Sequence, residues 1–291
     1  MSDDRPMAEK FRSLAFSKMT GSGNDFVFFD GRQVDSASLT LPEVIRAICN
    51  RHNGIGADGM VILEPFEAHM EQGGRGSQAR IHYFNSDGTP ADLCGNATLC
   101  SATMSIALGI ADANGMGLET PSGRISSRVV DGQPEIELQP VATVIADIDI
   151  VRAAGEERIG FAVVGIPHVV VLCENADSVD LDSRGSPMRH HVATGPKGAN
   201  VNWVSPVHNG SWRYRTFERG VEAETLACGT GAVATAILLT TWGLASSPIR
   251  ILTRSGRELV VGLARLSDTW RPTLRGEGRI VFRGTIGDLG L

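Results

Sequence analysis

The alternation of apolar runs with polar, glycine-containing turns divides the chain into short strands and a few helices. Runs of four to eight apolar residues between turn signals predict strands, and a helical spacing that opens on Pro42 predicts a helix over 42–49. Residues 14–30 read as a strand, a glycine loop and a second strand. Residues 165–168 are expected to form a connection between strands. Further strands are predicted at 60–63, 79–84, 124–130, 135–138, 161–164, 169–172, 200–205, 211–217, 249–253, 258–263 and 280–282.

Two longer apolar segments, 94–108 and 229–242, contain many small residues and predict buried helices. They open alike, on Cys94-Gly95-Asn96 and on Cys228-Gly229-Thr230. The two cysteines lie 134 positions apart (228 minus 94), close to half of the 291 residues. The sequence therefore predicts an α/β (α+β) fold of two similar halves, each with a mixed or antiparallel sheet wrapped round a central helix.

The expected halves divide the chain near its middle. The first, residues 1–138, carries Cys94 and is completed by a C-terminal strand within 279–291. The second, residues 139–278, carries Cys228. We expect a substrate site in the cleft between the two halves.

Composition and charge narrow the class of protein. The net charge of −6 gives no indication of a nucleic-acid or anionic-membrane partner. No apolar run approaches the roughly 18 residues of a membrane span, and residues 1–10 are polar, unlike a signal peptide. Five cysteines, an odd number, without a secretion signal favour free thiols in a reducing compartment. We therefore expect a cytoplasmic protein.

Cys-Gly at the start of a helix is a chemically distinctive arrangement. The unpaired N–H groups and the helix dipole lower the pKa of a thiol there and also bind a carboxylate. Glycine after the cysteine lets a ligand approach the backbone closely. Two matched sites, at Cys94 and Cys228, favour symmetric handling of one small anionic substrate. The plainer alternative is that both cysteines only cap buried helices.

Paired thiols suit the inversion of a carbon that bears a hydrogen. One face of that carbon needs a base and the other an acid, and a thiolate and a thiol can exchange these roles. Two helix N-termini aimed at an α-carboxylate would stabilise the carbanion. The chain has only three lysines (Lys10, Lys18 and Lys197), so a Schiff-base cofactor has few candidates. These features favour an amino-acid racemase or epimerase that uses neither a cofactor nor a metal.

Several motifs also carry a resemblance to a known family. They are Lys18-Met19-Thr20-Gly21-Ser22-Gly23-Asn24-Asp25-Phe26, Gly56-Ala57-Asp58-Gly59, Asn85-Ser86-Asp87-Gly88, Cys94-Gly95-Asn96, Gly165-Ile166-Pro167-His168, Asn200-Val201-Asn202, Glu218-Arg219-Gly220 and Glu224-Thr225-Leu226-Ala227-Cys228-Gly229-Thr230-Gly231. From about Phe16 to Ile286 the sequence resembles the diaminopimelate epimerases, cofactor-independent enzymes of bacterial lysine and cell-wall synthesis. The resemblance implies their fold and the interconversion of LL- and meso-2,6-diaminopimelate. The sequence leaves open whether the chain is a monomer or a homodimer.

The resemblance implies a role for each motif residue. Cys94 and Cys228 would be the acid–base pair, and His168 and Glu218 would tune their pKa values. The carboxylate at the reacting carbon would be held by Gly95, Asn96, Gly229 and Thr230. The distal amino-acid end would be bound by Asn24, Asn85, Asn200, Glu218 and Arg219, where a guanidinium suits a carboxylate and a carboxylate suits an ammonium. On the residues alone, His168 would be a structural histidine and Asn24 a left-handed turn residue.

The chain departs from the family pattern at some positions. Ile166 stands where the family often has Asn, and Gly59 where some members have Gln. A related two-cysteine racemase for histidine or hydroxyproline is therefore an alternative. From another class, the cysteines could belong to a zinc-binding or redox-disulfide protein, although Cys94-x5-Cys100 lacks common zinc-ligand spacing. The remaining cysteines lie in apolar runs and are expected in the core: Cys49, Cys100 and Cys173.

Overall fold

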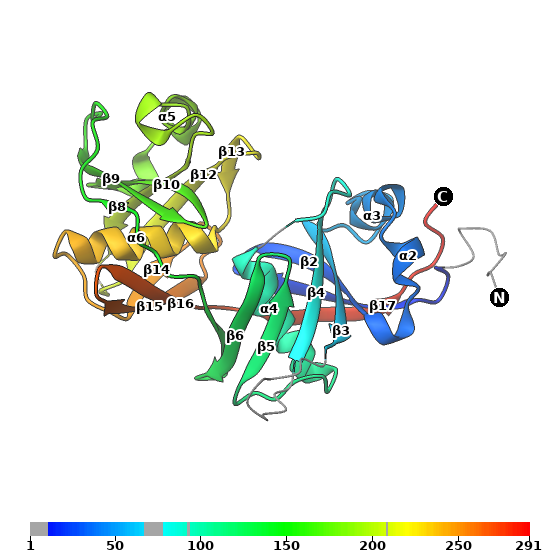
Figure 1. Ribbon diagram of the computed structural model, residues 1–291. Coiled ribbons are helices and arrows are strands. Elements are labelled where there is room, and N and C mark those ends of the chain that lie inside the picture. Colours follow the sequence, from blue (N-terminus) through cyan, green and yellow to red (C-terminus); the bar gives the residue numbers. More distant parts are fainter. Residues whose placement is uncertain (1–10, 67–77, 92–93, 208) are drawn as a thin grey trace. The chain divides into compact units, whose positions relative to one another are not determined.

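The computed structural model describes residues 11–66, 78–91, 94–207 and 209–291 (Figure 1). The polar segment 1–10 lies outside these residues. The chain forms two compact units: unit 1 comprises Met1–Ile136 with Glu277–Leu291, and unit 2 comprises Glu137–Gly276. No helix in the described part of the chain has the length and apolar character to cross a membrane.

Unit 1 is a mixed sheet with helices. Its strands, in the order in which neighbours pair, are β17 (Arg279–Thr285), β1 (Ala15–Gly21), β2 (Asn24–Asp30), β3 (Gly59–Pro65), β4 (Gln78–Asn85), β5 (Met116–Thr120), β6 (Gly123–Val130) and β7 (Gln133–Glu137). Its helices are α2 (Ser36–Leu39), α3 (Pro42–Cys49) and α4 (Gly95–Ala107), with a 3₁₀ turn at Gly31–Gln33.

Unit 2 repeats this arrangement. Its strands pair in the order β8 (Val144–Ile145), β9 (Glu156–Val164), β10 (Ile166–Cys173), β11 (Asn200–Pro206), β12 (Trp212–Glu218), β14 (Ile249–Leu252), β15 (Glu258–Leu266) and β16 (Thr269–Arg275). The short β13 (Ala223–Thr225) pairs with the end of β12. The helices are α5 (Leu181–Arg189) and α6 (Gly229–Thr241), and 3₁₀ turns occur at Ala176–Ser178 and Val192–Thr194.

The directions of neighbouring strands follow one series in both units. From β17 to β7 and from β8 to β16, the series is antiparallel, antiparallel, parallel, antiparallel, parallel, antiparallel, antiparallel. In unit 1 the long helix follows the fifth strand of this series, β4. In unit 2 it follows the fifth strand, β12, after the short β13. The predicted α/β fold of two similar halves is confirmed.

The long helices are the centres of the two units. In α4 and in α6, ten of thirteen residues are buried, and α6 contacts strands β9, β10, β11 and β15 (Figure 1). A helix that is apolar or small on every side is stable only when it is enclosed. The opposite face of each sheet is covered by a shorter helix: α3 packs on β3, and α5 on β11 and β12. Strands buried on both faces explain unbroken apolar runs such as Phe26–Phe29.

Some sequence-based expectations for individual elements were wrong. Residues 165–168 are not a connection, because β10 already begins at Ile166 and only Gly165 turns the chain, with φ +69°. Asn24 is not left-handed: it begins β2, and the left-handed residues are Ser22 and Gly23, with φ 54° and 111°. The elements that the sequence pattern did not indicate are α2, α5, β5, β8, β13 and β16.

Candidate active site

Both cysteines predicted to react stand directly before the long helices. Cys94 precedes α4 with φ −130° and ψ 117°, and Cys228 precedes α6 with φ −130° and ψ 113°. Neither side chain makes a capping hydrogen bond. The free N–H groups and the dipole of a helix start favour an anion there, either a thiolate or a bound carboxylate. Each unit therefore presents one thiol in the same backbone setting.

In unit 1 a hydrogen-bonded relay of three side chains joins the start of α4 to the start of β2 and to Asp58. Asn96 donates from Nδ2 to Oδ1 of Asn24 (2.7 Å), and Asn24 donates from Nδ2 to Oδ2 of Asp58 (3.0 Å). A carboxylate can only accept, so Asp58 fixes the orientation of the Asn24 amide, which in turn fixes that of Asn96. Asn96 is 2% exposed, and its Oδ1 has no partner within the described residues.

The orientation of Asn96 refines its predicted role. The free atom of its side chain is an acceptor, which suits an ammonium and repels a carboxylate. A carboxylate at this helix start would therefore be bound by the backbone N–H groups of Gly95 and Asn96.

An ion-pair cluster anchors this relay. Arg51 donates to Asp58 Oδ1 (2.6 Å) and to both oxygens of Asp25 (2.8 and 3.0 Å), and the buried Lys18 lies 2.7 Å from Asp25. Burial acts against the charged form of Asp25, but the hydrogen bonds from Arg51 and Lys18 prevail and lower its pKa to about 2. The start of β2, which carries Asn24 and Asp25, is therefore held by the charges of Arg51 and Lys18.

Asp58→Ala is expected to lower the kcat/KM of the reaction catalysed at this site about tenfold. The reason is that the Asn24 amide loses the acceptor that orients it. Steady-state kinetics of the purified variant measure this effect. Asp30→Ala is the matched control, since Asp30 pairs with Arg32 and has no bond to Asn24. Equal losses in both variants would contradict an orienting role for Asp58.

Packing explains why position 59 is a glycine in this chain. A Cβ at this position would lie 2.6 Å from the ring of Tyr83 and 2.6 Å from the backbone oxygen of Phe84. The Tyr83 ring also packs edge-on against Phe26, with centroids 5.9 Å apart. Burial and the neighbouring Cys94 raise the pKa of Tyr83. Tyr83 thus occupies the space next to Cys94 that a side chain at position 59 would need, which sequence reasoning missed.

In unit 2 several predicted residues gather round Cys228. Its Sγ lies 3.9 Å from Nδ2 of Asn200 and 3.5 Å from Oγ1 of Thr230. Asn200 accepts at Oδ1 from the backbone N–H of Arg219 (2.8 Å). Glu218, at the end of β12, accepts a hydrogen bond from Thr225. Asn200 therefore links the thiol to the segment that carries Glu218 and Arg219.

His168 is paired in register with Asn200 on the adjacent strand and is fully buried. Burial, and then the charge of Arg219, lower its pKa to about 3, so the ring is neutral near pH 7. Asn202, beside it, and Tyr214 were not among the predicted site residues. They join it through side-chain hydrogen bonds, described below.

Asn85 lies apart from the hydrogen bonds just described. It ends β4 and donates from Nδ2 to Oγ1 of Thr89 (3.1 Å), in the turn that follows. Its partner in the β3–β4 register is Gly59. Its predicted contact with substrate stays a prediction.

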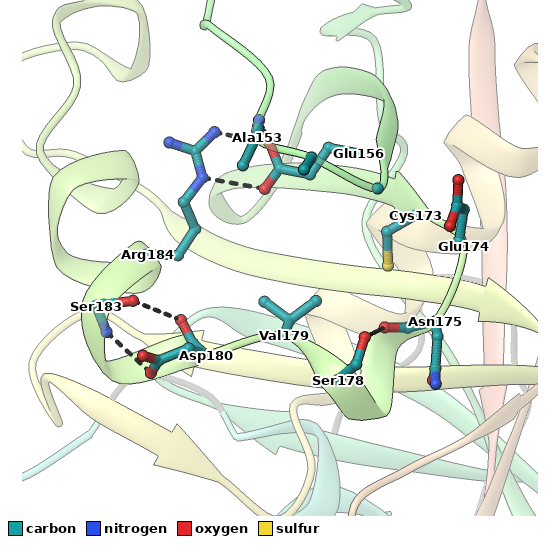
Figure 2. A pocket seen from close by; sticks show the side chains of 12 residues that line it. Ala153, Glu156, Cys173, Glu174, Asn175, Ser178, Val179, Asp180, Ser183 and Arg184 are labelled. Atoms are coloured by element: carbon teal, nitrogen blue, oxygen red, sulfur yellow. Dashed lines mark hydrogen bonds and ion pairs between the residues drawn. The ribbon is translucent and has the colours of Figure 1, made fainter.

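Unit 2 also has a cavity of about 490 Å³ that contains none of the predicted site residues (Figure 2). Its wall is held by structural hydrogen bonds. Arg184 binds both carboxylate oxygens of Glu156, which also accepts from the backbone N–H of Ala153, and Asp180 accepts from the backbone N–H of Ser183 at the start of α5. Arg184, Glu156 and Asp180 therefore already have hydrogen-bonding partners within the fold.

No group of three or more His, Cys, Asp or Glu side chains suited to a metal ion occurs within the described residues. The three cysteines expected in the core are buried there. Burial raises the pKa of Cys49 and of Cys173 to about 12, and it also raises the pKa of Cys100 well above its usual value. Their thiols are therefore protonated at neutral pH.

Comparison with known proteins gives consistent matches. The sequence pattern of the family described as diaminopimelate epimerase matches residues 16–143 and 160–262. A diaminopimelate epimerase of Gemmatimonas aurantiaca is 58% identical over 95% of this chain and 100% of its own length. That of Aquifex aeolicus is 34% identical over 94% of this chain and 98% of its own.

Solved structures share the fold at low identity. A phenazine biosynthesis protein of the PhzF family from Bacillus anthracis matches with a TM-score of 0.71 and 12% identity, over 94% of this chain and 98% of that one. A hydroxyproline epimerase from Agrobacterium vitis matches with a TM-score of 0.64 and 16% identity, over 94% and 93%.

Proposed function

The chain belongs to the diaminopimelate epimerase family, and from this premise we propose that it interconverts LL- and meso-2,6-diaminopimelate without a cofactor. It is an isomerase. The observation that carries the proposed mechanism is the pair of cysteines in the same backbone setting before two buried helices. We further propose that it acts in the cytoplasm on this small amino acid, in lysine and peptidoglycan precursor synthesis, as a monomer or homodimer.

The proposed reaction uses the two thiols as base and acid. One thiolate removes the α-hydrogen as a proton, so that the C–H bond breaks, an S–H bond forms and the electron pair moves into the α-carboxylate. The thiol on the other face then gives its proton to the carbon, and its own S–H bond breaks. Cys94 and Cys228 take these roles in turn, and the reverse reaction exchanges them. No electron is gained or lost overall.

The charge that develops on the carboxylate needs preorganised donors. Backbone N–H groups at Gly95, Asn96, Gly229 and Thr230 would supply them, because helix N-termini hold free donors aimed outward. At the other end of the substrate, Arg219 would bind the carboxylate and Glu218 the ammonium, with Asn24, Asn85 and Asn200 as hydrogen-bonding partners. His168 and Glu218 would set the pKa values of the thiols.

Incubation of reduced protein with LL-diaminopimelate in D₂O, without added cofactor, tests the proposed function. We expect meso product with deuterium at the inverted carbon, measured by chiral separation and mass spectrometry. A panel with proline, hydroxyproline and histidine runs in parallel. Neither product nor exchange with diaminopimelate, together with turnover of another amino acid, would overturn the substrate assignment.

A further inference from the structure

A buried polar cluster in unit 2 surrounds the side chain of Asn202. We propose that Asn202 is a positioning residue that holds the imidazole of His168 with its proton on Nε2. Asn202 is 0% exposed and lies on β11, between His168 on β10 and two hydroxyl side chains on β12, Tyr214 and Thr216. The inference goes beyond the proposed function, because it concerns the state of one ring in the free protein.

The contacts of Asn202 permit only one orientation of its amide. Oδ1 accepts from the hydroxyl of Tyr214 (2.8 Å) and from that of Thr216 (3.0 Å), and Nδ2 donates to the backbone oxygen of Val169 (2.8 Å). In the reversed orientation Oδ1 would face the Val169 oxygen at hydrogen-bond distance. Two acceptors in contact in a buried place are strongly unfavourable. The amide nitrogen therefore faces His168.

This orientation determines the tautomer of the histidine. The second hydrogen of Asn202 Nδ2 faces Nδ1 of His168 at 3.4 Å, so Nδ1 must carry the lone pair. The ring is fully buried and neutral, and a neutral imidazole has one N–H. That hydrogen is consequently on Nε2.

The Nε2–H group is then a buried donor that can bind an acceptor. It is buried and has no partner within the described residues. A buried donor without an acceptor is unfavourable, so a bound group that accepts would be stabilised there. A protonated Nε2 has no lone pair with which to take up a proton from substrate, so at this atom His168 donates a hydrogen bond and does not act as a base. If the proposed function holds, the group that accepts is a carboxylate of the amino acid or a thiolate.

Nitrogen-15 NMR of the histidine rings in the full chain tests the proposal directly. Of the described histidines only His168 is buried, and its low pKa keeps its ring signals unchanged between pH 7 and pH 5. Loss of these signals in His168→Gln confirms their assignment. We expect a non-protonated Nδ1 signal and a protonated Nε2 signal. A proton on Nδ1, or a doubly protonated ring at pH 7, would overturn the proposal.

Asn202→Ala tests whether the contact of Asn202 with His168 fixes the tautomer. We expect both tautomers to appear and kcat to fall about tenfold, with a smaller change in KM, since one oriented hydrogen bond is lost. Ser205→Ala is the matched control: Ser205 is also buried on β11, and its hydroxyl accepts from the backbone N–H of Ala176 and has no bond to His168 or Asn202. Tyr214→Phe supplies a second variant if Asn202→Ala does not fold. An unchanged tautomer in a folded Asn202→Ala protein would refute a positioning role, whether or not diaminopimelate is the substrate.

Discussion

Alanine at Cys94 or at Cys228 is expected to reduce epimerisation by about 10²–10⁴-fold, the usual contribution of a positioned acid or base. Each variant lacks either the group that removes the proton or the group that returns it. Because inversion needs both steps, the two losses should be of similar size. Chiral analysis of the product in both directions measures them.

Exchange of the α-hydrogen separates this two-base scheme from a single-base one. In each alanine variant the remaining thiol can still remove and return a proton on its own face. We therefore expect Cys94→Ala and Cys228→Ala to exchange deuterium into opposite stereoisomers without inverting them. Cys49→Ala and Cys173→Ala are the controls, since both thiols are buried with pKa values near 12. Full epimerisation in either reactive-cysteine variant would contradict the scheme.

The features that could be predicted from the sequence are those set by local physics. The two long helices combine small and apolar residues on all sides, and both begin at Cys-Gly, so their position and burial follow from the residues within them. Apolar runs bounded by turns likewise indicated most strands. The helix α5 was not predicted because its nine residues are mostly polar and include Pro187. Its stability comes from packing on β11 and β12.

The parts of the site that sequence missed depend on long-range register. Asn96, Asn24 and Asp58 come from three separate segments, and nothing within any one of them indicates that their amides are linked. Tyr214 reads as an ordinary strand residue until the β11–β12 pairing brings its hydroxyl to Asn202. The repeated Cys-Gly pattern could thus locate the thiols, but not the side chains that orient their neighbours.

The contact of Gly231 in α6 with Tyr214 and Asn202 leads to a second large expected effect. Replacing this glycine with alanine should destabilise the protein, although helix propensity alone predicts the opposite. Gly231 is the third residue after Cys228, inside α6, where alanine would ordinarily stabilise a helix by about 1 kcal/mol. Here a Cβ would overlap the hydroxyl of Tyr214 and the Oδ1 of Asn202. Both atoms are buried and hydrogen-bonded to each other, so neither can move freely. Overpacking of this kind costs about 1–3 kcal/mol.

Gly231→Ala is therefore expected to lower Tm by several degrees, about 2–4 °C for each kcal/mol, and to lower kcat/KM at least about tenfold by displacing Asn202 from His168. Ala97 is the matched position in α4, three residues after Cys94, and is already alanine and buried. Ala97→Gly should cost only about 0.5–1 kcal/mol, the ordinary helix penalty. Calorimetry and kinetics of both variants, and of Gly231→Ala combined with Tyr214→Phe, measure the contrast. Removal of the hydroxyl should recover part of the Tm. A stabilised Gly231→Ala protein would show that the hydroxyl and amide do not bound the space at the start of α6.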